Sequence, residues 1–151
     1  MPFRIVSFNL ENLDDGPNVR PALSERIAIM RPQLQRLRAD ILCLQEVHTQ
    51  GPSGARTFAA LDELLADTGY ETFHRQTTLT SSGEPYDVRN IVIASRFPFA
   101  GDAQIVRDSS GPRPSYQIAT ADPPDATADP LQWERPMLYS RITVAPGITL
   151  H

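Results

Sequence analysis

The stretch that decides the fold is Ile41-Leu42-Cys43-Leu44-Gln45-Glu46-Val47. Its apolar run has the length and composition of a buried strand in a parallel sheet. The run closes in a carboxamide and a carboxylate, which a strand does not need in order to fold. Because ligands bind at the carboxyl ends of strands in open α/β sheets, Glu46 is either a metal- or substrate-binding group or a carboxylate that reaches solvent.

Length and composition limit the class of protein. The 151 residues suffice for one domain with its own core, and we take 1–151 as a single domain. The net charge of −4 does not suggest an electrostatic nucleic-acid binder, although bound divalent cations could supply positive charge toward a phosphodiester. The single cysteine, Cys43, excludes an internal disulfide and a cysteine-rich zinc site. We find neither a signal peptide nor an apolar segment of membrane-spanning length, so we expect a cytoplasmic protein without a membrane span.

The amino-terminal part predicts a strand, a helix and a second strand. Residues 3–8 are aromatic and β-branched, which favours a strand that ends at Asn9. Apolar residues recur at helical spacing over 27–37, with Ser24 as the expected cap, and Pro32 should kink or interrupt this helix. Together with the opening stretch, these segments form a βα unit whose two strands should pair in one sheet.

The later part of the chain is richer in loops. Residues 108–130 are too proline-rich for a compact connection and predict either a functional surface loop or a partly disordered insertion. The sequence stops within an expected strand, so we expect it to be a fragment of a longer protein. The other expected elements are a helix capped by Thr57 and strands over 70–76, 90–95, 103–107 and 137–144, with a last strand starting at 148.

Two of the predicted strands end in a group with a hard oxygen, Asn9 and Glu46. If the strands are parallel neighbours, these side chains lie side by side at one rim of the sheet. A carboxylate plus an amide oxygen suits a hard divalent cation such as Mg²⁺, which takes few protein ligands and keeps several waters. From spacing alone, an asparagine such as Asn9 is more often a turn residue than a ligand, and Glu46 is either a ligand or a solvated strand end.

Four segments, in order, carry a family resemblance. They are Phe8-Asn9-Leu10-Glu11-Asn12-Leu13, then Asp40 through Val47, then Arg89 through Pro98, and last Trp133-Glu134-Arg135-Pro136-Met137-Leu138. Together they resemble the amino-terminal half of the endonuclease/exonuclease/phosphatase superfamily. That superfamily includes deoxyribonuclease-like enzymes, abasic-site endonucleases, inositol-polyphosphate phosphatases and neutral sphingomyelinases.

The resemblance implies an α/β fold of the α+β sandwich type. The chain should supply a mixed sheet flanked by helices, which is one half of a four-layer α/β-β/α sandwich. A missing carboxyl-terminal half of the same fold should cover the apolar face of the sheet. The family's later landmarks, an Asp-x-Asn and a terminal Ser-Asp-His, are absent from this sequence.

The resemblance also implies an activity for the full-length protein. That activity is Mg²⁺- or Mn²⁺-dependent hydrolysis of phosphoester bonds by a nuclease-like phosphodiesterase, with nucleic acid among the candidate substrates. The alternatives are a phosphatase or a sphingomyelinase-like phosphodiesterase that acts on a small or lipid substrate, and a non-catalytic, truncated binding domain.

Three residues match positions with roles in the family. Glu46 matches the glutamate that ligates the catalytic metal, and Asn9 matches the asparagine beside it. Arg135 matches an arginine that contacts the substrate phosphate in some members, as the planar fork of a guanidinium allows. The alternative for Arg135 is a surface ion pair with Glu134 or Asp129.

Three further residues are weaker candidates. Arg89 and Asn90 border the same predicted rim and are phosphate-binding candidates, with solvation at a strand edge as the alternative. The family places a catalytic histidine on the strand to which His151 belongs. Only three residues of that strand precede His151, so we expect it to precede the catalytic histidine.

Overall fold

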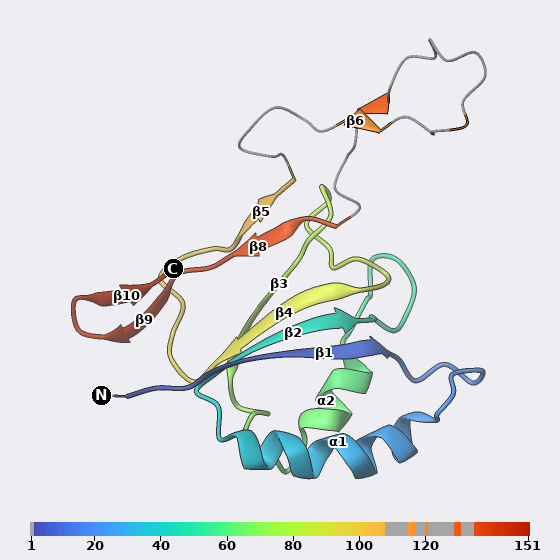
Figure 1. The fold of residues 1–151 in the computed structure, drawn as a ribbon, viewed down its shortest axis with the longest axis horizontal. Coiled ribbons are helices and arrows are strands. Elements are labelled where there is room, and N and C mark those ends of the chain that lie inside the picture. Colours follow the sequence, from blue (N-terminus) through green and yellow to red (C-terminus); the bar gives the residue numbers. More distant parts are fainter. Residues whose placement is uncertain (1, 108–114, 117–119, 121–128, 131–134) are drawn as a thin grey trace.

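The fold is built on one four-stranded sheet (Figure 1). The computed structural model describes residues 2–107, 115–116, 120, 129–130 and 135–151. The parallel pair β1–β2 and the antiparallel pairs β2–β4 and β4–β3 make the sheet mixed, with the order β1-β2-β4-β3. Its elements are β1 (Ile5–Leu13), β2 (Ile41–Val47), β3 (His74–Thr77) and β4 (Asn90–Ser95), with helices α1 (Leu23–Leu37) and α2 (Ala59–Leu65).

Smaller antiparallel pairs of strands form separate sheets outside this one. The strands are β5 (Gln104–Val106) with β8 (Met137–Tyr139), β6 (Ser115–Tyr116) with β7 (Asp129–Pro130), and β9 (Ile142–Ala145) with β10 (Ile148–Leu150). Most of the proline-rich segment 108–130 lies outside the described residues, and so does the prediction made for it. Among the described residues, no helix is long and apolar enough to cross a membrane.

The core lies between the sheet and the two helices. Leu42 and Leu44 of β2 are fully buried in one cluster with Leu34 of α1 and Leu61 of α2. The alternate residues of β2 point to the opposite face, because successive side chains of a strand alternate. There, Ile41 and Cys43 border a hollow of about 520 Å³, together with residues of β8, β9 and β10. Within the described residues, helices therefore cover one face of the sheet only.

The predicted fold class is confirmed: the chain is an α/β protein with a mixed sheet and two helices. The strands over 41–47 and 90–95 have the expected bounds, and the short strand within 103–107 is present as β5. Strand β1 is longer than predicted, since it continues past Asn9 to Leu13. The expected strand over 137–144 is divided into β8 and β9.

The helix boundaries differ from the predictions in their details. Ala22, not Ser24, is the N-cap of α1, and its N–H donates to the Glu25 carboxylate at 3.2 Å. The helix runs continuously through Pro32, which is exposed. Thr57 does not cap α2, because its backbone pairs with that of Gln50 and the helix begins two residues later.

The expected strand over 70–76 starts late, at His74. Tyr70 is buried instead, and its hydroxyl donates to the Leu34 carbonyl at 2.9 Å and accepts from the Ala39 N–H at 2.9 Å. These two hydrogen bonds tie the chain after α2 to the end of α1, and a continuous strand would lose them.

Candidate functional site

The carboxyl ends of β1 and β2 are joined by an irregular, bulged pairing. Asn9 lies opposite Gln45 and Leu13 lies opposite Val47, so three residues of β1 span the place of Glu46 alone. Against β4, the bulge lies on β2, since Leu44 pairs with Val92 and Val47 with Asn90. Bulges of this kind bend a strand and redirect side chains, and they are common beside active sites.

Three residues of this bulge adopt the left-handed conformation. The φ angles are 48° at Glu11, 54° at Asn12 and 60° at Glu46. A left-handed backbone at a residue other than glycine costs about 1–3 kcal/mol and persists only where surrounding contacts enforce it. At Glu46 it breaks the alternation of β2, so the carboxylate is not held in the regular direction of the strand.

The Glu46 carboxylate is held in its ionised form. Its Oε1 accepts a hydrogen bond from Asn9 Nδ2 at 3.2 Å and lies 3.7 Å from a terminal nitrogen of Arg135. The pKa of Glu46 is lowered, first by the Asn9 hydrogen bond and, against the opposing effect of burial, by the Arg135 charge, the Asn12 backbone N–H and the Arg89 charge. The side chain remains 21% exposed, so the carboxylate is both charged and accessible.

Asn9 supports this carboxylate with a donor. Its Oδ1 accepts a hydrogen bond from the Glu11 N–H at 2.7 Å, which leaves Nδ2 facing Glu46. Asn9 and Glu46 therefore lie side by side on parallel strands, as predicted. The Asn9 side chain therefore supports the Glu46 carboxylate through Nδ2, and its amide oxygen keeps a second lone pair beside the Glu11 hydrogen bond.

Arg26 of α1 holds the bulge from the helix side. Its guanidinium donates to the Asn12 carbonyl at 3.2 Å, to the Glu11 carbonyl at 3.1 Å and to the Leu10 carbonyl. Three consecutive carbonyls of an irregular strand thereby find donors that the sheet does not supply. Arg26 lies in the first turns of α1, so the position of the helix and the shape of the bulge are coupled.

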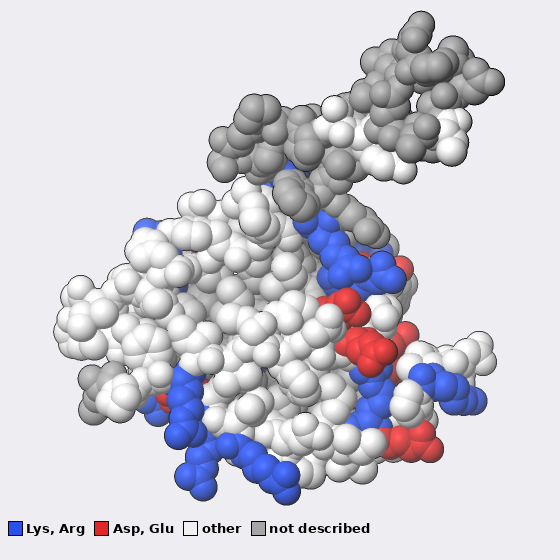
Figure 2. Space-filling model, in the orientation of Figure 1, with Lys and Arg blue, Asp and Glu red and all other residues white. Residues whose placement is uncertain are grey.

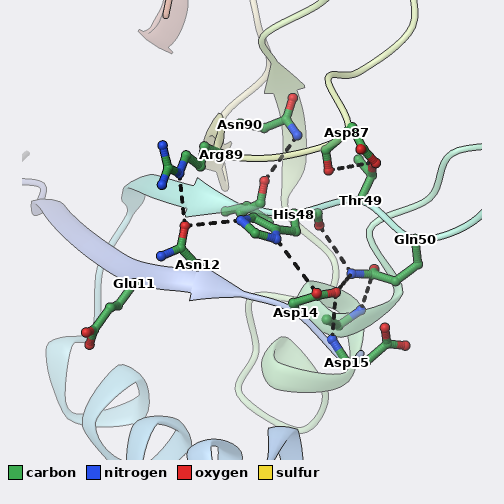
Figure 3. A network of polar contacts seen from close by, with 12 residues as sticks. Glu11, Asn12, Asp14, Asp15, His48, Thr49, Gln50, Asp87, Arg89 and Asn90 are labelled. Carbon is green, nitrogen blue, oxygen red and sulfur yellow. Dashed lines mark hydrogen bonds and ion pairs between the residues drawn. The ribbon is translucent and has the colours of Figure 1, made fainter. Parts of the chain in front are cut away.

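A polar network extends from the bulge toward α2 (Figure 3). Asn12 Oδ1 lies 3.2 Å from Arg89 Nε and 3.2 Å from His48 Nε2. The other ring nitrogen of His48 is 3.8 Å from the Asp14 carboxylate, which also accepts from Gln50 Nε2 at 3.2 Å. Asn12, Asp14 and His48 were not predicted as site residues. Asp14 and His48 directly follow β1 and β2, and this position is a signal that could have found them.

The weaker candidates lie in different surroundings. Asn90 is fully buried, and its amide donates to the Val47 and Tyr86 carbonyls and accepts from the Tyr86 N–H and the Thr78 hydroxyl. This amide is saturated and holds β4 against β2 and a loop. Asn90 therefore takes no part in the site that we propose, whereas Arg89 belongs to it.

Arg135 approaches Glu46 from the segment before β8, with 37% of its side chain exposed. The ion-pair partner of Arg135 in the structure is Glu46. Of the two partners predicted for Arg135, Glu134 lies outside the described residues, and the pair with Asp129 stays a prediction. A small cavity of about 120 Å³ adjoins the site, and its lining is Thr78, Tyr86, Val88, Arg89, Ile91, Arg135 and Pro136. Figure 2 shows basic and acidic side chains side by side where β1 and β2 end.

His151 is not brought to this rim. It borders the hollow on the face of the sheet opposite the helices, together with Ile41. Ile41 is the first residue of β2, at the opposite end of the strand from Glu46. Its Nδ1 lies 2.5 Å from the Tyr139 hydroxyl. This placement agrees with the expectation that His151 is not the catalytic histidine of the family, which stays a prediction.

The rim fits a hard cation with few protein ligands. In the described part of the chain, no group of three or more His, Cys, Asp or Glu side chains could enclose a metal ion. Glu46 offers one accessible, ionised carboxylate, and Mg²⁺ is commonly bound through one or two carboxylates with waters and substrate phosphate as the other ligands. A closed cage made of protein ligands is therefore not the kind of site that these residues build.

One solved structure is similar to this chain: an endonuclease/exonuclease/phosphatase from Beutenbergia cavernae DSM 12333. The identity is 28%, the match covers 70% of this chain and 28% of that chain, and the TM-score is 0.44. The description of that protein names the superfamily that the sequence motifs resemble. No family model and no curated protein matches the chain.

Proposed function

We propose that the intact protein is a divalent-metal-dependent hydrolase of phosphoester bonds, of the nuclease-like phosphodiesterase type. The observation that carries the proposal is the rim at Glu46. There, one ionised, accessible carboxylate is supported by the Asn9 amide and faced by the guanidinium groups of Arg135 and Arg89. A carboxylate for a cation beside guanidinium groups for an anion is the combination that a metal–phosphate pair requires.

In this proposal Glu46 holds Mg²⁺ or Mn²⁺, and Asn9 orients the carboxylate. The cation, when bound, neutralises charge that develops on the phosphate oxygens during hydrolysis. Arg135 donates to the substrate phosphate, for which its terminal N–H groups are suited by geometry. Arg89 adds a second positive charge and, through its Nε, fixes the Asn12 side chain at the same rim.

The proposal concerns the intact protein because this chain spans 28% of the similar solved structure. The groups that orient an attacking water are expected from a carboxyl-terminal half of the same fold. If the intact protein lacks groups that orient an attacking water, it should bind its ligand without hydrolysing it.

The test is a substrate panel on the intact protein. Bis(p-nitrophenyl) phosphate serves as the diester and p-nitrophenyl phosphate as the monoester, each with Mg²⁺, with Mn²⁺ and with a chelator. We expect hydrolysis that depends on the metal, with the diester as the better substrate, and its loss in Glu46→Gln. Full activity of Glu46→Gln would show that Glu46 does not hold the metal.

Two observations favour a second candidate, a phosphatase or sphingomyelinase-like enzyme with a small or lipid substrate. The net charge is −4, and the cavity beside Arg135 is small, so neither feature suits bulk duplex DNA. Preference for the monoester, or for a choline-phosphate lipid over DNA, would support this candidate. Ligand binding without any hydrolysis would support a binding domain.

A further inference from the structure

Asn12 is held through all of its polar groups except one. Its backbone N–H helps to lower the pKa of Glu46, and its carbonyl accepts from Arg26 at 3.2 Å. Its Oδ1 lies 3.2 Å from Arg89 Nε and 3.2 Å from His48 Nε2. In the part of the chain that the structure describes, Asn12 Nδ2 has no hydrogen-bond partner.

The direction of the Asn12 amide follows from the chemistry of Arg89. The Nε of a guanidinium can only donate, so the Asn12 atom that faces it must be the oxygen. His48 Nε2 faces the same oxygen and must therefore carry a proton. Two donors on one side leave the amide nitrogen on the other side, and Figure 3 shows it pointing away from both Arg89 and His48.

The backbone of Asn12 is fixed as firmly as its side chain. Its φ of 54° lies in the left-handed region, which asparagine adopts more readily than most residues. Arg26 binds its carbonyl and those of the two preceding residues. A donor that is fixed before its ligand arrives loses little conformational freedom on binding.

We propose that Asn12 is a substrate-binding residue whose Nδ2 donates to an oxygen of a phosphate group bound beside Glu46. Arg89 and His48 are positioning residues that hold the amide in this direction. The choice of phosphate rests on the proposed function. A phosphate offers several acceptor oxygens, and the Asn12 backbone and the Arg135 guanidinium both lie near the Glu46 carboxylate.

The test compares two substitutions of Asn12. Asn12→Asp keeps an oxygen for Arg89 and His48 and tolerates the left-handed backbone, but it replaces the outward donor by an acceptor. Asn12→Gly keeps the backbone contacts to Glu46 and Arg26 and removes the side chain. Asn18→Asp is the matched control, because it adds the same charge on an exposed loop residue nearby.

Binding of inorganic phosphate to the intact protein with Mg²⁺, measured by calorimetry, is the first readout. We expect roughly 10- to 100-fold weaker binding in Asn12→Asp and about tenfold weaker binding in Asn12→Gly, as for loss of a hydrogen bond to a charged group. Asn18→Asp should bind like the wild type, and Asn12→Gly should keep its Mg²⁺ affinity. Phosphate affinity within twofold of wild type in both Asn12 variants, or no phosphate binding by the wild type, overturns the proposal.

Hydrolysis of bis(p-nitrophenyl) phosphate is the second readout, and it separates the two proposals. If the wild type binds phosphate through Asn12 but hydrolyses no ester, the proposed function fails and the assignment of Asn12 stands. The positioning role of His48 is tested with His48→Ala and His48→Gln. Glutamine retains a donor, so it should restore phosphate binding that alanine weakens, whereas equal loss in both variants contradicts that role.

Discussion

An acidic residue lies near each end of strand β2, Asp40 just before it and Glu46 close to its carboxyl end, and the two are held in different ways. Asp40, just before the strand, accepts from the Arg4 N–H at 2.7 Å and from Arg96 Nε at 3.0 Å, where the sheet register is regular. Glu46 lies in a bulge, in a left-handed conformation, with an amide at 3.2 Å and a guanidinium nitrogen at 3.7 Å. Asp40 is bound in short contacts that fasten strands, while Glu46 is ionised and open to a ligand.

The largest expected effect separates these two carboxylates. Glu46→Gln should lower metal-dependent hydrolysis at least about 100-fold, because it removes the proposed metal-binding charge. Asp40→Asn should leave hydrolysis unchanged and cost about 1–3 kcal/mol in the free energy of unfolding, because charge-assisted hydrogen bonds are weakened. Kinetics and urea unfolding of both variants check this. Equal loss of activity in both variants would contradict the assignment of metal binding to Glu46 and of a structural role to Asp40.

The second effect concerns the bulge that separates Glu46 from a regular strand. Arg26→Ala leaves three β1 carbonyls without their donors, so it should lower both stability, by about 1–3 kcal/mol, and Mg²⁺ affinity, by roughly tenfold. Arg31→Ala is the matched control on the same helix, since Arg31 donates to carbonyls of α2. It should lower stability alone. Unchanged Mg²⁺ affinity in Arg26→Ala would show that the bulge does not shape the site.

The third effect is on the pH dependence of Mg²⁺ binding. The pKa of Glu46 is lowered chiefly by the Asn9 hydrogen bond, so the carboxylate stays ionised to a lower pH than an ordinary glutamate. Asn9→Ala should raise this pKa and move the acid limb of Mg²⁺ binding to higher pH. Calorimetric titrations with Mg²⁺ between about pH 3 and 7, which brackets the ordinary pKa of glutamate, measure this shift. An unmoved limb would contradict the role of Asn9.

The smallest effect concerns Glu84, which has no part in the site. Its pKa is lowered first by the Gly54 N–H, then by Ser53 and Arg56, against the opposing effect of burial. A carboxylate with a lowered folded-state pKa stabilises the protein above its unfolded-state pKa, and this contribution disappears as the pH falls through the folded-state value. Glu84→Gln should therefore lower stability near pH 7 but not at strongly acidic pH, with metal binding unchanged throughout.

Sequence reasoning could predict the parts that depend on pattern. Apolar runs and helical spacing were enough for β2, β4 and both helices. The polar residues at the ends of the two predicted strands were enough to place Asn9 beside Glu46. The bulge was not predictable in this way, because Arg26 enforces it from a residue that reads as an ordinary polar position of a helix. Asn90 shows the converse, since a polar residue at a strand end proved to be a saturated core group.

Glu46 is the group on which the proposed metal site depends most, and paramagnetic NMR tests this directly. Substoichiometric Mn²⁺ added to ¹⁵N-labelled protein broadens the amide signals nearest to the bound ion. We predict that Asn9, Glu46 and Asn12 broaden first, and that Glu46→Gln abolishes this selective broadening while Asp40→Asn preserves it. Broadening centred elsewhere, or unchanged in Glu46→Gln, would contradict the assignment of the metal to this rim.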